Sequence, residues 1–401
     1  MIKLSRRSLL GSAGAGAMTL AVPDFALAAP AAGKRVLVVI FLRGGVDGLS
    51  LAVPHADPDY YNARRAIAVG RPGKPGGAID LDGRFGLHPR LAPLEPAYRA
   101  GELAIVHAVG SHHATRSHFE AQDYAETATP GQPSTRSGWL ARSLVSAGKP
   151  STPLGVVALS DKRPLGLRGG VDVVTAARLD AFRLRAPKRL NARLDRAFNA
   201  LYAKGDDAVT VAGRDALGAA KRLKSLEQTS ARAGYPEAAR GLADVARLVR
   251  ADVGLRVAWI DAGGWDTHQG QGGADGGRLP RAFDALAKGL AAFRKDLGRD
   301  LERVVVLVMT EFGRTVAENG TGGTDHGHGS AMLLLGGPVR GGRVHGTWPG
   351  LAPEQRYEGR DLAVTTDYRD VLAEISERHL GARDPGGVLP GHSPRALGIL
   401  R

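Results

Sequence analysis

The sequence predicts an α/β protein whose mostly parallel sheet is covered by helices on both faces. Three observations support this class: five apolar runs have the length of buried strands, helical patterns separate them, and Gly-rich polar segments flank them. A parallel strand is apolar throughout because both of its faces are covered. With 401 residues, 43% of them apolar, the chain is long enough for one large domain with an insertion, or for two ordinary domains.

The expected elements alternate along the chain. The expected strands are 35–42, 103–109, 255–260, 303–309 and 331–335. The expected helices between them are 89–100, 118–127, 237–253 and 280–297. The segment of about 179–233 is rich in arginine, has a helical period and contains few strand signals, so it predicts a helical insertion or cap over the site. Its basic face has few aromatic residues for base stacking, which favours a solvated helix surface over a specific nucleic-acid groove.

The N-terminus has the features of an export signal. Arg6 and Arg7 form a twin-arginine pattern, a Gly- and Ala-rich apolar stretch covers 9–22, and Ala26-Leu27-Ala28 is a small-x-small cleavage site. We therefore expect residues 1–28 to be a twin-arginine signal peptide and 29–401 to be the mature protein. The protein is then periplasmic or secreted, and the twin-arginine export machinery is a partner. No later run reaches about 18 apolar residues, so no transmembrane segment is expected in the mature form.

Charge and cysteine content limit the chemistry. The net charge is +14, and cleavage after Ala28 would remove three basic residues and one acidic residue to leave +12. A basic protein attracts nucleic acid, anionic lipid, or phosphorylated and sulfated substrates. The chain has no cysteine, which excludes disulfides, a thiolate nucleophile and a Cys-ligated metal.

Polar residues gather where the predicted strands end. Ligands of parallel α/β sheets bind outside the carboxyl ends of the strands. The segments at these ends supply Asp47, then Thr115, Ser117 and His118, then Asp266 and His268, then Glu311, and finally Asp325, His326 and His328. Carboxylates with imidazoles and without cysteine suit Zn²⁺, Mn²⁺ or Mg²⁺, and the histidines favour a transition metal such as zinc or manganese. A polar cleft without metal is the alternative.

Seven stretches of the chain carry a family resemblance. They are FLRGGVDGLSLAVP, GLHPRLAPLEPAYRAGELAIVHAVG, TRSHFEAQDYAE, GGWDTHQGQ, TEFGRT, TDHGHGSAMLLLGGPVRGG and TTDYRDVLAEI. In this order they resemble the twin-arginine-exported bacterial proteins grouped as domain of unknown function 1501. That family distantly resembles the alkaline phosphatase and arylsulfatase superfamily. The resemblance implies a three-layer α/β/α, alkaline phosphatase-like domain and a divalent metal.

The superfamily resemblance also implies roles for single residues. A carboxylate after the first strand binds metal, and Asp47 matches it. A hydroxyl at a helix N-terminus is the nucleophile; Ser117 fits this position, Thr115 is the alternative, and either could instead be only an N-cap. An Asp and His pair binds metal, and Asp266 with His268 matches it in type.

The last motif allows two alignments. By its letters, Asp325-His326-Gly327 matches the superfamily's Asp-His-Gly. By strand position, Glu311 replaces the Asp of that motif and Phe312 replaces its His. His326 and His328 then belong to the superfamily's last ligand segment, which precedes the final strand. The second alignment is preferred because strand 303–309 runs directly into Thr310-Glu311. Phe312 cannot bind metal, which argues against a second ion.

The expected function is hydrolysis of a phosphate or sulfate ester, on a small molecule or a polymer, in the periplasm. Ser117 would attack, and one of Arg43, Arg116 and Arg314 could clamp the anion. Salt bridges to carboxylates of the same loops are the alternative for each of these arginines. Two other functions stay open. One is a non-catalytic binding or assembly protein that keeps the fold, and the other is binding of anionic polymers through the basic surface.

Overall fold

The computed structural model describes residues 35–181, 188–226 and 234–401, and a nine-stranded sheet forms its centre. The strand order is β11-β5-β10-β9-β1-β8-β6-β7, with β12 also paired to β5. The strands are β1 Val36–Leu42, β5 Leu103–Gly110, β6 Val156–Leu159, β7 Val174–Thr175, β8 Val257–Ala262, β9 Val304–Met309, β10 Ser330–Leu335, β11 Arg343–His345 and β12 Thr366–Asp367. Only β10 runs antiparallel to its neighbours, β5 and β9, so the predicted mostly parallel sheet is confirmed.

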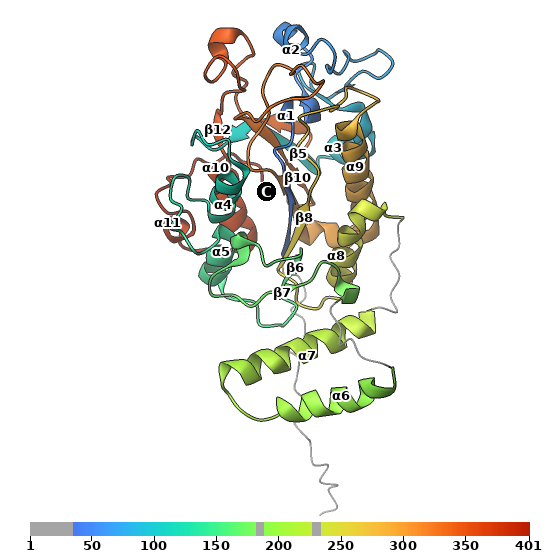
Figure 1. Ribbon diagram of the computed structural model, residues 1–401, viewed down its shortest axis with the longest axis vertical. Helices are drawn as coiled ribbons and strands as arrows, with labels where there is room; N and C mark the ends of the chain where they lie inside the picture. Colours follow the sequence, from blue (N-terminus) through green and yellow to red (C-terminus); the bar gives the residue numbers. More distant parts are fainter. Residues whose placement is uncertain (1–34, 182–187, 227–233) are drawn as a thin grey trace, which may run out of the picture.

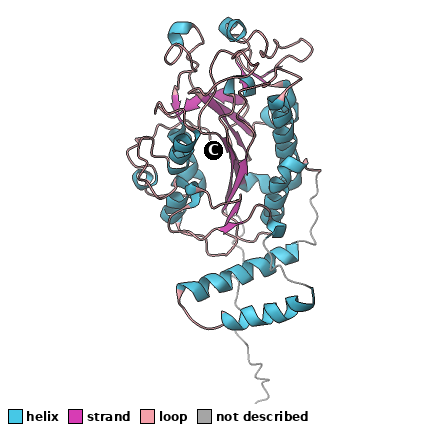
Figure 2. Cartoon of the chain, in the orientation of Figure 1, coloured by secondary structure: helices cyan, strands magenta, loops and turns pink. Residues whose placement is uncertain are grey.

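Helices cover both faces of this sheet (Figures 1 and 2). One layer contains α4 (His118–Thr127), α5 (Trp139–Ala147) and α10 (Tyr368–Glu374). The other contains α3 (Glu95–Arg99), α8 (Arg240–Arg250) and α9 (Arg278–Leu297). Strand β1 is apolar throughout because both of its faces are covered. Val36, Val38 and Ile40 pack against the second layer, and the residues between them pack against the first. The three-layer α/β/α class is therefore confirmed.

The predicted elements agree with the observed ones to within a few residues, with two differences. The expected helix 89–100 is a 3₁₀ turn (Pro89–Leu94) followed by α3, because Pro93 and Pro96 each lack the N–H that a continuous α-helix needs. The short strands β6, β7, β11 and β12 were not predicted, since runs of two to four residues carry little periodicity.

Smaller elements surround this framework. A three-stranded sheet joins β2 (Ala52–Val53), β4 (Gly86–Leu87) and β3 (Ile79–Asp80). The short helices are α1 (Gly48–Leu51), α2 (Pro58–Ala63) and α11 (Pro385–Val388), and a π-helix (Ile375–Leu380) follows α10. Helices α6 (Lys188–Leu201) and α7 (Ala208–Leu226) extend beyond the sheet at the end away from α1 and α2 (Figure 1), and α7 anchors them by packing Ala219 and Leu223 into the main core.

The predicted signal peptide, residues 1–28, lies outside the described residues. Within the described parts of the chain, none of the helices has both the length and the apolarity needed to cross a membrane.

Candidate metal centre

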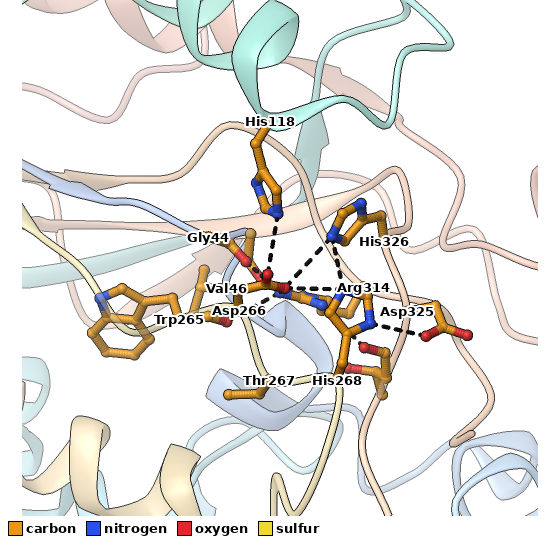
Figure 3. A network of polar contacts seen from close by, with 12 residues as sticks. Gly44, Val46, His118, Trp265, Asp266, Thr267, His268, Arg314, Asp325 and His326 are labelled. Atoms are coloured by element: carbon orange, nitrogen blue, oxygen red, sulfur yellow. Dashed lines mark hydrogen bonds and ion pairs between the residues drawn. The ribbon is translucent and has the colours of Figure 1, made fainter. Parts of the chain in front are cut away.

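The polar segments meet at one edge of the sheet. Parallel strands β1, β5, β8 and β9 all end there, so the residues that follow them lie together. Strand β10 runs in the opposite direction and begins at that edge, which brings the residues that precede it to the same place. Segments far apart in the sequence thus meet around Asp266 (Figure 3).

Three donor atoms lie in mutual contact at this edge. The Nε2 atom of His268 lies 2.9 Å from Nε2 of His326 and 3.1 Å from Oδ1 of Asp266. The Nε2 atom of His326 lies 3.5 Å from the same carboxylate oxygen. Asp266 and His268 stand in the loop between β8 and α9, and His326 stands just before β10.

His118 adds a fourth donor from above (Figure 3). It is the first residue of α4, and its buried Nε2 atom makes no hydrogen bond. That atom lies 3.6 Å from Oδ2 of Asp266, and its ring centroid is 4.3 Å from that of His326. One donor atom each from His118, Asp266 and His326 lies within 4.8 Å of the others, a grouping that can hold a metal ion.

The opposite nitrogen of each imidazole is held by an acceptor. Nδ1 of His118 lies 2.7 Å from Oε1 of Glu311, and Nδ1 of His268 lies 2.9 Å from Oδ1 of Asp325. Nδ1 of His326 lies 2.9 Å from the Arg116 carbonyl oxygen, which can only accept a hydrogen bond. The Nδ1 atoms therefore carry the protons and donate them. Such contacts fix the tautomer that metal-binding histidines need.

This arrangement leaves lone pairs on the three converging Nε2 atoms. Two such lone pairs 2.9 Å apart repel unless a proton or a metal ion lies between them. The pKa of His326 is lowered, first by burial and then by the charges of His118 and Arg314, which disfavours the proton.

The known separations of these donors from Asp266 and His326 are compatible with one ion. Zinc binds imidazole nitrogen and carboxylate oxygen at about 2.0–2.2 Å, so two donors on one tetrahedral ion lie about 3.3 Å apart. The four measured separations, 2.9, 3.1, 3.5 and 3.6 Å, lie on both sides of this value. Three imidazoles and one carboxylate also match the ligand types preferred by zinc and related transition metals.

Asp266 is ionised in this setting. Burial by itself would raise the pKa of its carboxyl group, but the hydrogen bond and charge of Arg314, with smaller contributions from His268 and His118, hold that pKa below its ordinary value. Arg314 is fully buried and donates to Asp266 Oδ1 over 2.5 Å. Its remaining donors go to four carbonyl oxygens, those of Gly44, Gly45, Trp265 and Thr324.

Glu311 holds the His118 ring in place through its contact with Nδ1. Besides accepting from His118, its Oε1 atom accepts from the backbone N–H of Gly44 at 2.8 Å and from Nε2 of Gln122 at 3.0 Å. Burial raises the pKa of Glu311, but the hydrogen bonds from His118 and Gln122 outweigh burial and lower it overall. Gly44 has φ +124, and a Cβ atom there would lie 2.4 Å from the backbone nitrogen of Asp266, so only glycine permits this approach.

Asp47 lies in a separate buried ion pair. Its two carboxylate oxygens accept from Arg64 at 2.6 and 2.9 Å, and Oδ2 also accepts from Ser50 and Gln271, each at 2.7 Å. Burial would raise the pKa of Asp47, and Arg64 lowers it. The structure thus does not bring Asp47 into the group of four donors, and a guanidinium satisfies the carboxylate that the superfamily resemblance assigned to a metal.

The remaining predicted residues surround the centre at different depths. Glu311 and Asp325 contact ligand histidines through Nδ1 and do not themselves belong to the group of four donors. His328 is buried and stacks on Tyr357, with ring centroids 4.1 Å apart, and burial lowers its pKa to about 4. Phe312 packs its ring against His118 and His326, at 4.8 and 5.0 Å.

The predicted catalytic residues lie at the start of α4. Ser117 is its exposed N-cap, and its hydroxyl makes no capping hydrogen bond. The Thr115 hydroxyl donates to Glu120 Oε2 at 2.6 Å and accepts from the Ser117 N–H at 3.2 Å. The Arg116 guanidinium pairs with Glu358 and Asp361, so it is not directed at the donors.

Sequence reasoning missed His118 as a ligand and Arg64 as the partner of Asp47. In the sequence His118 follows Ser117, whose residue type is typical of a helix N-cap and of a nucleophile. The local signal was the spacing itself: the first residue of a helix that starts at the carboxyl edge of a sheet faces the site. Arg64 lies 17 residues from Asp47 within an irregular stretch, and no periodicity pointed to it.

A family model described as "Protein of unknown function (DUF1501)" matches residues 34–389. This chain belongs to the DUF1501 family. The resemblance drawn from the seven motif stretches is thereby confirmed, and the match spans the whole sheet and the candidate centre. No curated protein matches this DUF1501 chain significantly.

Solved structures similar to this DUF1501 protein include the C-terminal periplasmic domain of EptC from Escherichia coli. One such structure, a complex with Zn, has 11% identity and a TM-score of 0.34, covering 76% of this chain and 73% of that one. Another has 10% identity and a TM-score of 0.37, covering 90% and 88%. Alkaline phosphatase from the Antarctic bacterium TAB5 has 10% identity and a TM-score of 0.31, covering 77% and 93%. These scores are too low to transfer any chemistry to this chain.

Proposed function

We propose that this DUF1501 protein is an exported, metal-dependent hydrolase that acts on a phosphate or sulfate ester. One observation supports this most strongly: three imidazole Nε2 atoms, each with its Nδ1 atom held by an acceptor, converge on the ionised carboxylate of Asp266. Without a cation between them, the lone pairs of such ring nitrogens repel one another, and the held Nδ1 atoms match the contacts that orient metal-binding histidines.

His118, Asp266, His268 and His326 would hold one divalent ion, zinc or manganese. When bound, such an ion neutralises charge on a phosphoryl or sulfuryl group and lowers the pKa of a coordinated water. Glu311, Asp325 and the Arg116 carbonyl keep the imidazoles oriented. Arg314 fixes Asp266 and the Gly44–Gly45 turn, so the carboxylate is already positioned before an ion or a substrate arrives.

Ser117 is the proposed nucleophile. Its hydroxyl is exposed and makes no capping bond, and the next residue is the ligand His118. The N-terminus of α4 favours an anion beside it, because the first N–H groups of a helix lack partners within the helix. Thr115 has the same type of hydroxyl, but this group is already bonded to Glu120, which makes it the weaker candidate.

A binding protein that holds metal without turnover is the second candidate. It is favoured by the pairing of Arg43, Arg116 and Arg314 with carboxylates, which leaves these guanidinium groups poorly placed to clamp a substrate. Such a protein would bind its ion stoichiometrically and hydrolyse no ester.

The export route is part of the same proposal. The twin-arginine pattern, the apolar stretch and the Ala26-Leu27-Ala28 site indicate delivery of the folded protein to the periplasm or beyond. Deleting residues 1–28 should retain the protein in the cytoplasm, and replacing Arg6 and Arg7 by lysine should do the same.

The test combines metal content with turnover. Mature protein purified without chelators is expected to contain one equivalent of zinc or manganese by elemental mass spectrometry and to hydrolyse aryl phosphates or sulfates. Ser117→Ala should lower kcat by more than about tenfold without releasing the metal. The exposed Ser134→Ala is the matched control and should not change it. Metal without turnover on any ester would favour the binding protein, and no metal, even after adding divalent ions, would refute the centre.

A further inference from the structure

The charge around the candidate centre is low for a site that handles anions. The charged side chains that pair with its three histidines, or with one of these partners, are the carboxylates Asp266, Glu311 and Asp325 and the guanidinium of Arg314. Their formal charge is −2. A divalent ion brings this group to zero. The basic character of the whole chain, with a net charge of +14, is thus not concentrated at the centre.

The arginines near the centre do not change this balance, because each is paired with a carboxylate. The pairs are Arg43 with Glu126 and Asp261, Arg116 with Glu358 and Asp361, Arg314 with Asp266, and Arg360 with Asp361. The segments that form the site, 43–50, 111–118, 261–273, 310–328 and 357–361, contain no lysine. Each negative charge of a substrate is therefore left without a counter-charge in the described site, so a doubly charged ester is disfavoured more strongly than a singly charged one.

One aromatic ring at the start of α4 is exposed to solvent. Phe119 follows His118 in the first turn of α4 and is 87% exposed, the highest exposure among the large apolar side chains of the described residues. Exposing a whole phenyl ring forgoes the free energy of its burial, which a ligand with an apolar group would recover on binding. Phe119 and the proposed nucleophile Ser117 both stand at the start of α4, so an exposed apolar group and the nucleophile belong to the same end of one helix.

We infer that the substrate is a singly charged ester with an apolar substituent, namely a phosphodiester or a sulfate ester, and that doubly charged phosphomonoesters are poor substrates. The inference rests on the proposed hydrolase function and names its substrate class. In hydrolysis of a diester the Ser117 oxygen bonds to phosphorus, the bond to the leaving alkoxide breaks, and the hydroxyl proton of Ser117 passes to that alkoxide. A water oxygen then bonds to phosphorus, the bond to Ser117 breaks, and Ser117 takes one proton from that water. The product monoester loses its remaining proton to solvent and becomes a dianion, which the same low charge helps to release.

The experiment compares esters with one leaving group on the metal-loaded mature protein. At about pH 8, p-nitrophenyl phosphate carries two charges, while bis-p-nitrophenyl phosphate and p-nitrophenyl sulfate carry one. The kcat/KM for the diester should exceed that for the monoester by at least about tenfold. Turnover in which the monoester is preferred would overturn the substrate class alone, whereas metal binding without turnover of any of these esters would overturn the hydrolase function as well.

Charge at the site is tested with a variant that leaves the metal ligands intact. Glu358→Gln removes one of the two carboxylates that pair with Arg116. It should raise the ratio of monoester to diester kcat/KM by about threefold or more, and intrinsic ester reactivity cancels from this comparison between variants. Glu354→Gln, at another exposed position of the same segment, is the matched control and should leave the ratio unchanged. An equal ratio in all three proteins would refute the role of charge.

The apolar contact is tested with Phe119→Ala. This variant should lower kcat/KM for bis-p-nitrophenyl phosphate by about fivefold, since the second aryl group loses its contact, and leave methyl p-nitrophenyl phosphate within about twofold. An equal loss on both diesters would mean that Phe119 acts only on the structure of α4, and would remove the apolar part of the inference.

Discussion

Replacing Glu311 by glutamine distinguishes the two roles that sequence and structure give to this carboxylate. The family resemblance makes Glu311 a metal ligand, whereas the structure makes it the acceptor for Nδ1 of His118, at 2.7 Å. Glutamine keeps the shape of the side chain and one carbonyl oxygen, so His118 keeps an acceptor. What changes is the negative charge that strengthens this hydrogen bond and makes the imidazole a better ligand.

The expected size of the effect follows from that geometry. Losing a partner that orients a metal-binding histidine weakens metal binding by about 10–100-fold. Losing one of four ligands costs more. The free energy of zinc binding to a structural site is about 10–16 kcal/mol, or roughly 3 kcal/mol for each ligand. A loss of this size weakens zinc binding by more than about a hundredfold. Glu311→Gln should therefore weaken zinc binding by about 10–100-fold, and His118→Gln by more.

The assay is competition for zinc against a chromophoric chelator at neutral pH, with circular dichroism as the measure of folding. His328→Gln is the control, because His328 is a buried histidine from the same segment that stacks on Tyr357 and stands apart from the four donors. It should bind zinc as the wild type does. Two results would refute this account of the centre: wild-type affinity in Glu311→Gln, or a loss in that variant as large as in His118→Gln.

Three further predictions concern stability. Asp47→Asn should lower the free energy of unfolding by about 3–5 kcal/mol in a urea titration, because Arg64 then stays buried without a carboxylate partner. The zinc affinity of this variant should stay unchanged. A folded variant with lost zinc affinity would show that Asp47 is a metal ligand. Burial lowers the pKa of His107 to about 4, below the 6.5 of the unfolded chain, so the unfolded state binds the proton first and acid destabilises the fold. Between about pH 8 and pH 5 this should remove about 2 kcal/mol, a loss that His107→Gln should lack and the exposed His112→Gln should keep. Zinc at about 1,000 times its Kd should stabilise the apo-protein by about 4 kcal/mol, and an unchanged unfolding midpoint would contradict the centre.

The fold class could be read from the sequence because burial on both faces leaves a local record. Strand β1 is apolar at every position, since alternate residues enter opposite layers. Strand β9 has the same property, and β5, β8 and β10 are apolar apart from His107, Gly110, Asp261 and Ser330. The periodicity of the sequence does not show in which direction a strand runs. Strand β10 resembles its neighbours in sequence, and only its pairing in the structure shows that it runs antiparallel to β5 and β9.

The place of the site was also predictable, because a parallel sheet brings the ends of its strands to one edge. The sequence therefore indicated which segments would meet there, and the family resemblance offered residue types for a metal. Neither could say which carboxylate already had a partner. Asp47 and Asp266 look alike as acids in Gly-rich loops, but Arg64 encloses the first and three imidazoles surround the second.

The sequence by itself determined the layers, the edge where the polar loops gather and the membership of the DUF1501 family, since each depends on local pattern or on ordered motifs. Only the tertiary structure decided how the polar groups are paired. Hydrogen bonds and ion pairs link residues that are 17 to 267 positions apart, as in Arg64 with Asp47 and Gly44 with Glu311. Such pairings depend on distances in space, and no periodicity in a sequence records them.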